Sequence, residues 1–145
     1  MINEALCTLK RCDWKTPRSL YQALDLEFGF DFDPCPVDPK ADGLSSEWGQ
    51  CSFVNPPYGP MTGLWLRKGL EEASKGKTVV FLLNSRTDTT WWHNYAMKAT
   101  EIRFIKGRLC FDDAKGRAPF PSVILVFDPT KKNHNPIIST YTIRT

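Results

Sequence analysis

Cysteine and histidine are scarce in this sequence, and long apolar runs are absent. Five cysteines without a repeated spacing do not make a disulfide framework, and with the histidines His93 and His134 they form no zinc-binding pattern. No stretch approaches the roughly 20 apolar residues of a membrane span, and the N-terminus has no apolar signal core. We therefore expect a cytoplasmic protein with reduced thiols, no metal ion and no membrane partner.

The composition is that of an ordinary globular domain. The chain has 145 residues, with 41% apolar and 24% charged side chains, so we expect a single domain over residues 1–145 without a separate target-recognition domain. A net charge of +3 permits nucleic-acid binding without requiring it. Basic residues gather between Arg103 and Arg117, among phenylalanines. Such a segment could follow a phosphate backbone, although a solvated hairpin would have the same composition.

Hydrophobic periodicity predicts several helices. Thr16 is the expected N-cap of a helix that starts at Pro17 and ends near Phe28, just before Gly29. An amphipathic helix is expected over residues 61–74. A further helix is expected over residues 91–99.

Short apolar or alternating runs predict the strands. They are expected over residues 30–33, 51–54, 78–83, 102–105, 109–111 and 122–127, with an edge strand over 137–143. Strands and helices alternate through roughly the first hundred residues, which indicates an α/β fold. The run from Thr78 to Leu83 is continuously apolar, as in parallel strands that are covered on both faces.

The run Asn55–Gly59 follows the strand that is expected to end at Val54. Its two consecutive prolines restrict the backbone and remove two N–H donors, which leaves a stiff loop that presents hydrogen-bond acceptors. Taken alone, the run is equally typical of a simple turn after a strand. Its context in the chain has to decide between these interpretations.

Several segments taken together resemble the small phage-type DNA N6-adenine methyltransferases. In order, they are Trp14–Pro17, Asp33–Pro34, Asp42–Leu44 with Trp48, Asn55–Gly59, Arg86–Thr89, Arg103–Phe111 and Ala118–Ser122, and the resemblance spans residues 13–128. It implies S-adenosylmethionine as the methyl donor and double-stranded DNA as the partner, in a bacterial or phage-infected cell. It also implies a reduced class I, Rossmann-like methyltransferase fold with a mostly parallel sheet and a C-terminal antiparallel hairpin.

The resemblance assigns the acceptor chemistry to Asn55, Pro56 and Tyr58. The side-chain oxygen of Asn55 and the backbone carbonyl of Pro56 would accept the N–H groups of adenine N6 and return electron density to that nitrogen. Tyr58 would stack on the base, and Pro57 would contact it, after the base has flipped out of the duplex. No strong base is then needed, so the alignment of the amine with the methyl group dominates catalysis.

Asp33 and Pro34 are the leading candidates for the donor site, because the strand before them and the strand before the Asn-Pro-Pro-Tyr loop would meet at one edge of the sheet. The glycine-rich loop that usually follows the first strand in this superfamily is absent here. Asp42 is the candidate for the donor's ribose, and Trp14 and Thr16 are candidates for covering the donor. Both aspartates also suit plain turns, and the tryptophan also suits the core.

Substrate contacts are expected from Arg86, Asp88, Arg108 and Arg117. The first two follow a buried strand at the same sheet edge, where an exposed ion pair is the simpler interpretation. His93 is interpreted as part of a helix rather than as a general base. Base contacts are also expected from loops over residues 61–65 and 112–121, or from a second subunit, so the sequence leaves a homodimer open.

The expected activity is transfer of a methyl group from S-adenosylmethionine to N6 of a flipped adenine in DNA. The same tetrapeptide also serves enzymes that methylate RNA bases or glutamine side chains, which keeps those acceptors as alternatives. A catalytically silent DNA-binding relative is a further alternative. The missing glycine loop favours it, and the intact Asn55–Tyr58 motif opposes it.

Overall fold

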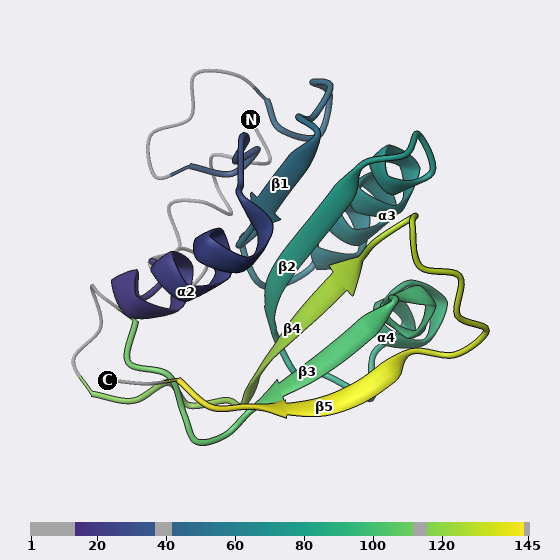
Figure 1. Cartoon of the computed structure of the whole chain (residues 1–145). Coiled ribbons are helices and arrows are strands. Elements are labelled where there is room, and N and C mark those ends of the chain that lie inside the picture. The colour runs from purple at the N-terminus through teal and green to yellow at the C-terminus, as the bar shows by residue number, and fades with distance from the viewer. Residues whose placement is uncertain (1–13, 37–41, 112–115, 144–145) are drawn as a thin grey trace.

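A five-stranded sheet organises the part of the chain that the computed structural model describes, residues 14–36, 42–111 and 116–143 (Figure 1). The strand order is β1-β2-β4-β3-β5. The strands are β1 (Cys51–Val54), β2 (Thr78–Asn84), β3 (Glu101–Ile105), β4 (Ser122–Phe127) and β5 (Ile137–Tyr141). β1 and β4 have the expected bounds, and β5 lies at the edge of the sheet as expected.

The sheet is mixed, and the expectation of a mostly parallel sheet was wrong. β1 pairs with β2 and β3 pairs with β5 in parallel, whereas β4 lies between β2 and β3 and runs antiparallel to both. All 6 residues of β4 are buried. A buried apolar strand has the same sequence pattern in either direction, so the pattern could not reveal this reversal. The expected antiparallel hairpin corresponds to β3 and β4, joined by a long connection over residues 106–121.

Helices cover both faces of the sheet (Figure 1). On one face lies α2 (Arg18–Phe28), where Tyr21 packs edge-on against Phe53 of β1. On the other face lies α3 (Thr62–Ala73), with α4 (Thr90–Asn94) beside it. Gly69 of α3 permits close packing, because a Cβ there would lie 2.5 Å from the ring of Phe81 in β2.

Two of the expected strands do not form. The segment Phe30–Asp33 contributes only a parallel bridge between Phe32 and Ser52 of β1, because the prolines at positions 34 and 36 stop it at once. Residues 109–111 are not a strand either. Leu109 is buried and accepts the backbone N–H of Ala118 at 2.7 Å, which closes a loop instead of a ladder.

The helix boundaries differ at two expected positions. α2 begins at Arg18 without a side-chain cap, and the hydroxyl of Thr16 accepts a hydrogen bond from Asn55 instead. The expected helix over residues 91–99 is divided into α4 and a 3-10 turn over Ala96–Lys98. Gly29 ends α2 as expected, in the left-handed conformation with a φ of 68°.

The centre of the core consists of β2 and β4. Residues 79–83 of β2 and 123–126 of β4 are completely buried. In the described ranges, no helix has the length and apolar character needed to cross a membrane. The strand directions bring the carboxyl ends of β1 and β2 and the amino end of β4 to the same edge of the sheet. That edge carries the candidate site.

Candidate active site

Asn55 follows β1 at this edge, and its side-chain amide is held in one orientation. The Nδ2 group donates to the backbone oxygen of Trp14 and, at 3.0 Å, to Oγ1 of Thr16. A backbone carbonyl can only accept, so the amide nitrogen has to face the segment before α2. The other end of the amide, Oδ1, is buried and has no hydrogen-bond partner among the described residues.

That unpaired oxygen is the main chemical feature of the loop. Leaving a buried acceptor without a donor costs about 1–3 kcal/mol, and the great majority of buried polar groups in proteins are paired. An acceptor of this kind suits a site where a ligand supplies the missing donor. An amine with free N–H groups has the required chemistry.

The backbone of the loop is fixed by its prolines and by Thr62. Pro56 is buried and Pro57 is half-buried, and neither has an N–H group to satisfy. The hydroxyl of Thr62 accepts from the N–H of Gly59 at 3.1 Å and donates to the oxygen of Pro57 at 3.5 Å. Gly59 has a φ of 138°, which favours glycine. The sequence analysis missed Thr62, whose signal was a hydroxyl residue at the start of a helix.

Tyr58 is buried, with 7% of its surface exposed. Its hydroxyl donates to the backbone oxygen of Leu82 in β2 at 3.1 Å, and burial raises the pKa of that hydroxyl. Its ring packs edge-on against Phe120, with the centroids 5.5 Å apart, and Phe120 in turn contacts Trp14. The expected stacking of a base on Tyr58 therefore requires neighbouring side chains such as Phe120 to move.

The candidate donor residue Asp33 lies on the side of β1 that faces away from β2. Phe32 bridges β1 in parallel, so Asp33 emerges near the edge that carries Asn55. Its Oδ1 accepts the backbone N–H of Cys35 at 2.8 Å, which is a local turn. Although Asp33 is exposed as a residue, protein atoms around its carboxyl desolvate it and raise its pKa, and the bond from Cys35 opposes this rise.

Asp42 and Gly43 lie against the turn that contains Pro34. A Cβ on Gly43 would lie 2.1 Å from the backbone oxygen of Pro34 and 2.7 Å from the ring of Trp65, so only glycine permits this approach. The Oδ1 atom of Asp42 accepts the N–H of Leu44 at 3.0 Å, again a local turn. The two candidate aspartates thus belong to turns that are in contact.

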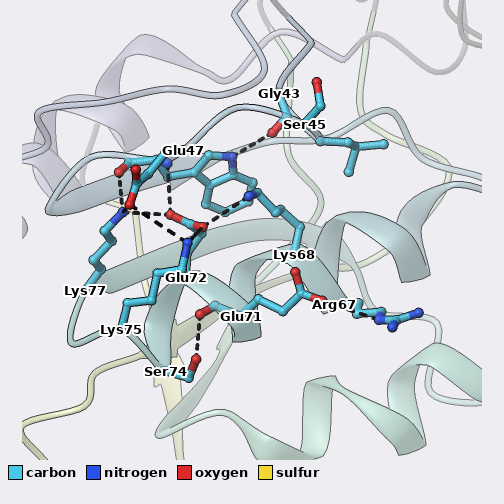
Figure 2. Close-up of polar contacts among 12 residues, drawn as sticks. Gly43, Ser45, Glu47, Arg67, Lys68, Glu71, Glu72, Ser74, Lys75 and Lys77 are labelled. Atoms are coloured by element: carbon cyan, nitrogen blue, oxygen red, sulfur yellow. Dashed lines mark hydrogen bonds and ion pairs between the residues drawn. The ribbon is translucent and has the colours of Figure 1, made fainter.

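A buried ion cluster holds the segment after Asp42 on α3 (Figure 2). Glu72 of α3 is completely buried and accepts the backbone N–H of Trp48 at 2.9 Å. Three lysines also donate to it, namely Lys68 at 3.1 Å, Lys75 at 2.8 Å and Lys77 at 2.8 Å. Burial alone would raise the pKa of Glu72, but these hydrogen bonds outweigh it and hold the pKa well below its usual range. Trp48 donates its indole N–H to the oxygen of Gly43 at 2.7 Å, so the cluster also positions the turn at Asp42.

Arg86 and Asp88 form an exposed ion pair, with 3.4 Å between Nε and Oδ1. An ion pair was the simpler of the two interpretations, the other being a contact with substrate. They lie after β2, at the expected edge. The hydroxyl of Thr89 donates to the backbone oxygen of Arg86 at 2.7 Å and caps α4. His93 is exposed, and its Nε2 atom lies 2.9 Å from the oxygen of Thr87. A substrate contact of Arg86 or Asp88 stays a prediction.

The basic segment divides into a buried part and an exposed part. Arg103 donates two hydrogen bonds of 2.7 Å to Glu27 of α2 and forms an ion pair of 3.1 Å with Glu101, and the bonds that it donates to Glu27 raise its pKa. It therefore joins α2 to β3. Arg108 and Arg117 are exposed, and each donates to a backbone oxygen of its own loop at 3.4 Å.

Three polar side chains at the same edge escaped the sequence analysis. Asn84, Ser85 and Ser122 each carry a buried oxygen without a hydrogen-bond partner in the described part of the chain. The available signal was a polar residue at the end of an otherwise apolar strand. Asn84 lies just beyond the strand that was expected over residues 78–83.

The remaining expectations concern loops and metal ions. Residues 61–65 are largely the first turn of α3 rather than a loop. Part of the other expected base-contacting loop, residues 112–115, lies outside the described residues, as do residues 37–41 before Asp42. No group of metal-ligating side chains comes together within the described ranges.

Comparison with known proteins identifies the family. The sequence model of the family described as DNA N-6-adenine-methyltransferase (Dam) matches residues 5–144. Among solved structures, the chain is similar in fold to the Type IIL restriction-modification enzyme MmeI in complex with DNA, with a TM-score of 0.50 and 16% identity over 86% of this chain. The likeness covers 23% of MmeI, and a search of curated proteins found no match. Because the family match extends over nearly the whole chain, the protein belongs to the DNA N-6-adenine-methyltransferase (Dam) family.

Proposed function

We propose that this protein transfers a methyl group from S-adenosylmethionine to N6 of adenine in double-stranded DNA. Family membership supports this class of reaction. One observation carries the proposal for this chain. The amide of Asn55 is oriented by Trp14 and Thr16, and its buried oxygen has no partner among the described residues.

The proposed role of Asn55 follows from the chemistry of the adenine amine. That nitrogen is a weak nucleophile because its lone pair is delocalised into the ring. Hydrogen bonds from its N–H groups to Asn55 Oδ1 and to the backbone oxygen of Pro56 would localise the lone pair on nitrogen. Positive charge develops on N6 as the new C–N bond forms, and both oxygens stabilise that charge more than they stabilise the neutral amine.

The proposed reaction does not require a general base in the transition state. The bonding pair of the methyl–sulfur bond stays on the sulfur as the methyl group moves to N6, and one N6 proton then passes to solvent. His93 is exposed and bonded near its own helix, which agrees with a reaction that does not use it. Fixing the amine close to the methyl group then supplies most of the acceleration.

The target base has to leave the duplex before it can reach Asn55. The amine of a paired adenine lies inside the base stack, and enzymes that modify it extrude the nucleotide. The rings of Trp14 and Tyr58 both pack against Phe120, and the backbone of Trp14 accepts from the Asn55 amide, so these rings would offer apolar faces for such a base. We propose that Phe120 moves when the base enters.

Asp33 and Asp42 are the residues that we propose hold the donor, which supplies an electrophilic methyl group when bound. The residues present suit it, because carboxylates can accept from an ammonium group and from ribose hydroxyls. Their turns are in contact through Gly43 and Pro34. The parallel run of the Phe32 segment, β1 and β2 supports a reduced class I arrangement, in which ligands bind beyond the carboxyl ends of the strands.

The decisive experiment uses unmethylated genomic DNA and S-adenosylmethionine with a labelled methyl group. We expect the label to enter DNA, and sequencing that detects N6-methyladenine to place it at a defined set of sites. Parallel reactions contain RNA or a protein extract in place of DNA. Label that enters RNA or protein but not DNA would contradict the proposal.

A further inference from the structure

We propose that Asn84 and Ser122 form a second polar pair, which binds the edge of the target base beside the Asn55 amide and so positions adenine for methyl transfer. This inference rests on the proposed function. It starts from the two unpartnered buried oxygens that these residues carry, Asn84 Oδ1 and Ser122 Oγ.

The strand register puts both side chains on the same face and at the same edge as Asn55. Asn84 of β2 lies directly opposite Ser122 of β4, and opposite residues in a ladder point to the same face. Val54 of β1 is paired with Phe81, so continuing the register sets Asn55 beside Leu82, two residues before Asn84. Because side chains alternate along a strand, the side chains of Asn55, Asn84 and Ser122 all point to the face of the sheet that α2 covers.

The spacing suits one base between these groups. Directly opposite side chains in an antiparallel pair have Cβ atoms roughly 5 Å apart, which sets Asn84 beside Ser122. Strand spacing and rise put the Cα atoms of Asn55 and Asn84 roughly 8 Å apart. Tyr58 donates to the backbone oxygen of Leu82, so its ring lies over the same end of β2.

Neither oxygen contributes a hydrogen bond to the described part of the fold. Ser122 is 1% exposed, and the neighbouring residues Leu83 and Val123 are completely buried. The two side chains are opposite each other, yet each oxygen lacks a hydrogen-bond partner in the described part of the chain. Each unmade bond costs about 1–3 kcal/mol, whereas apolar residues of similar size would avoid this cost. Polar groups at these positions therefore destabilise the fold unless a ligand binds to them.

The chemistry of the pair fits a nucleobase that carries an amino group. The two N–H groups of N6 are assigned to Asn55 and Pro56, so this pair would bind the ring nitrogen beside the amine. That nitrogen accepts a hydrogen bond from the amide N–H of Asn84 or from the hydroxyl of Ser122. Guanine and thymine carry an N–H group at the corresponding ring position, so they would oppose these donors. Cytosine has the same edge pattern as adenine but a smaller ring.

The position of the pair favours the acceptor base over the methyl donor. The segment that contains Asp33 lies on one side of β1, and β2 and β4 lie on the other side. Asn84 and Ser122 therefore flank Asn55 on the side away from Asp33. If the donor occupies the Asp33 side, only the base can reach this pair.

The test compares two substitutions in the full chain, Asn84→Leu and Ser122→Ala. For each variant, turnover is measured on unmethylated genomic DNA at saturating donor, together with the midpoint of thermal unfolding and the donor affinity by calorimetry. We expect turnover to fall about 10- to 100-fold, as for the loss of a specific base contact. The unfolding midpoint should stay the same or rise, because an unpaired buried group has been removed. The dissociation constant for the donor should change by less than about threefold, far below the tenfold that 1.4 kcal/mol would give.

Ser52→Ala is the matched control. Ser52 Oγ is also buried without a partner among the described residues, but its pairing with Val79 puts it on the α3 face of the sheet. This variant should also unfold at the same or a higher temperature, and its turnover should equal that of the wild type.

Several outcomes would overturn the inference. Turnover of both variants within about twofold of an active wild type would remove it and leave the proposed function intact, since a base contact is worth more than that. A loss of donor affinity as large as the loss of turnover would assign the pair to the donor. If Asn84→Leu does not fold, Ser122→Ala decides by the same criteria. A wild-type protein that methylates no DNA would overturn the proposed function and this inference together.

Discussion

In the proposed function, the orientation of one side-chain amide separates a reactive Asn-Pro-Pro-Tyr loop from an ordinary turn. The two ends of a carboxamide are similar in size, so Asn55 offers an acceptor to a ligand only while its nitrogen is held elsewhere. Trp14 and Thr16 hold that nitrogen. The segment before α2 therefore acts on the acceptor loop, whereas the sequence suggested that these residues cover the donor. A donor contact of either residue stays a prediction.

Thr16→Val tests this orientation with little change in shape. The substitution removes the 3.0 Å bond from Asn55 Nδ2 and leaves the bond to Trp14. A hydrogen bond of this kind contributes about 1 kcal/mol, so we expect turnover at saturating donor and DNA to fall about fivefold. Thr16→Ser keeps the hydroxyl and should retain the wild-type rate. Equal losses in the two variants would show that the hydroxyl does not matter.

At this scale, the sequence predicted the position of the loop better than its contacts. The Asn55–Tyr58 loop follows a strand as expected, and the role of its oxygens stays a prediction. The partners of the amide were not predictable, because they lie about 40 positions earlier in the chain and no local pattern links them. The burial of Tyr58 was equally hidden, since it depends on a bond to Leu82 and on packing against Phe120.

At the scale of elements, α3 connects the Asn55–Gly59 loop to the turns that contain Asp33 and Asp42. Its first turn carries Thr62, which fixes the loop, and its last turn carries Glu72, which holds the segment after Asp42. Breaking a buried ion pair by removing one partner typically costs about 3–5 kcal/mol. The proposed donor site should therefore depend strongly on Glu72.

Glu72→Gln should lower the free energy of unfolding by about 3 kcal/mol at pH 7, measured by denaturant titration. The pKa of Glu72 is lowered in the folded protein, so its contribution is present above the pKa of the unfolded chain and is lost as the pH falls towards the folded value. The wild type should lose stability below about pH 4.5, and the variant should lose less over that range.

Glu71→Gln is the control for this prediction. Glu71 belongs to an exposed pair with Arg67, 3.5 Å apart, and exposed pairs contribute about 0–1 kcal/mol. An equal change in stability for the two variants, or an unaltered acid slope in Glu72→Gln, would contradict the assigned role of the cluster.

The elements themselves were largely predictable, and their directions were not. β1, β2, β4, α2 and α3 form close to where apolar runs and periodicity indicated. The reversal of β4 was hidden because all its residues are buried. The segment Phe30–Asp33 has the alternation of a strand but only bridges β1, because the prolines at positions 34 and 36 stop it.

At the scale of the whole molecule, the proposed site has two sides that meet at Asn55. The candidate donor turns lie on one side of β1, and the buried polar pair of β2 and β4 lies on the other. The chain spans less than a quarter of the length of MmeI. Among the loops of this chain, the one with Arg108 and Arg117 carries exposed positive charge, and we expect it to contact DNA.

Substitution of Arg108 and Arg117 together by glutamine should weaken DNA binding and its dependence on salt. Each lost phosphate contact reduces the magnitude of the slope of log K, the association constant for DNA, against log salt by about 0.9. The slope of the double variant should therefore be smaller in magnitude by up to about 1.8. Binding is measured by fluorescence anisotropy over a range of salt concentrations. Arg67→Gln removes an exposed arginine from α3 on the other face of the sheet and should leave the slope unchanged. An unchanged slope in the double variant would exclude these phosphate contacts.

The measurement that tests the central claim most directly is single-turnover formation of N6-methyladenine by the wild type and by Asn55→Ala. Both reactions use saturating S-adenosylmethionine and unmethylated genomic DNA, and DNA affinity is measured in parallel. Loss of an oriented group that stabilises developing charge typically costs about 10²–10³-fold in rate. We therefore predict a loss of that size in Asn55→Ala, with DNA affinity little changed. A near-normal rate in this variant would contradict the account.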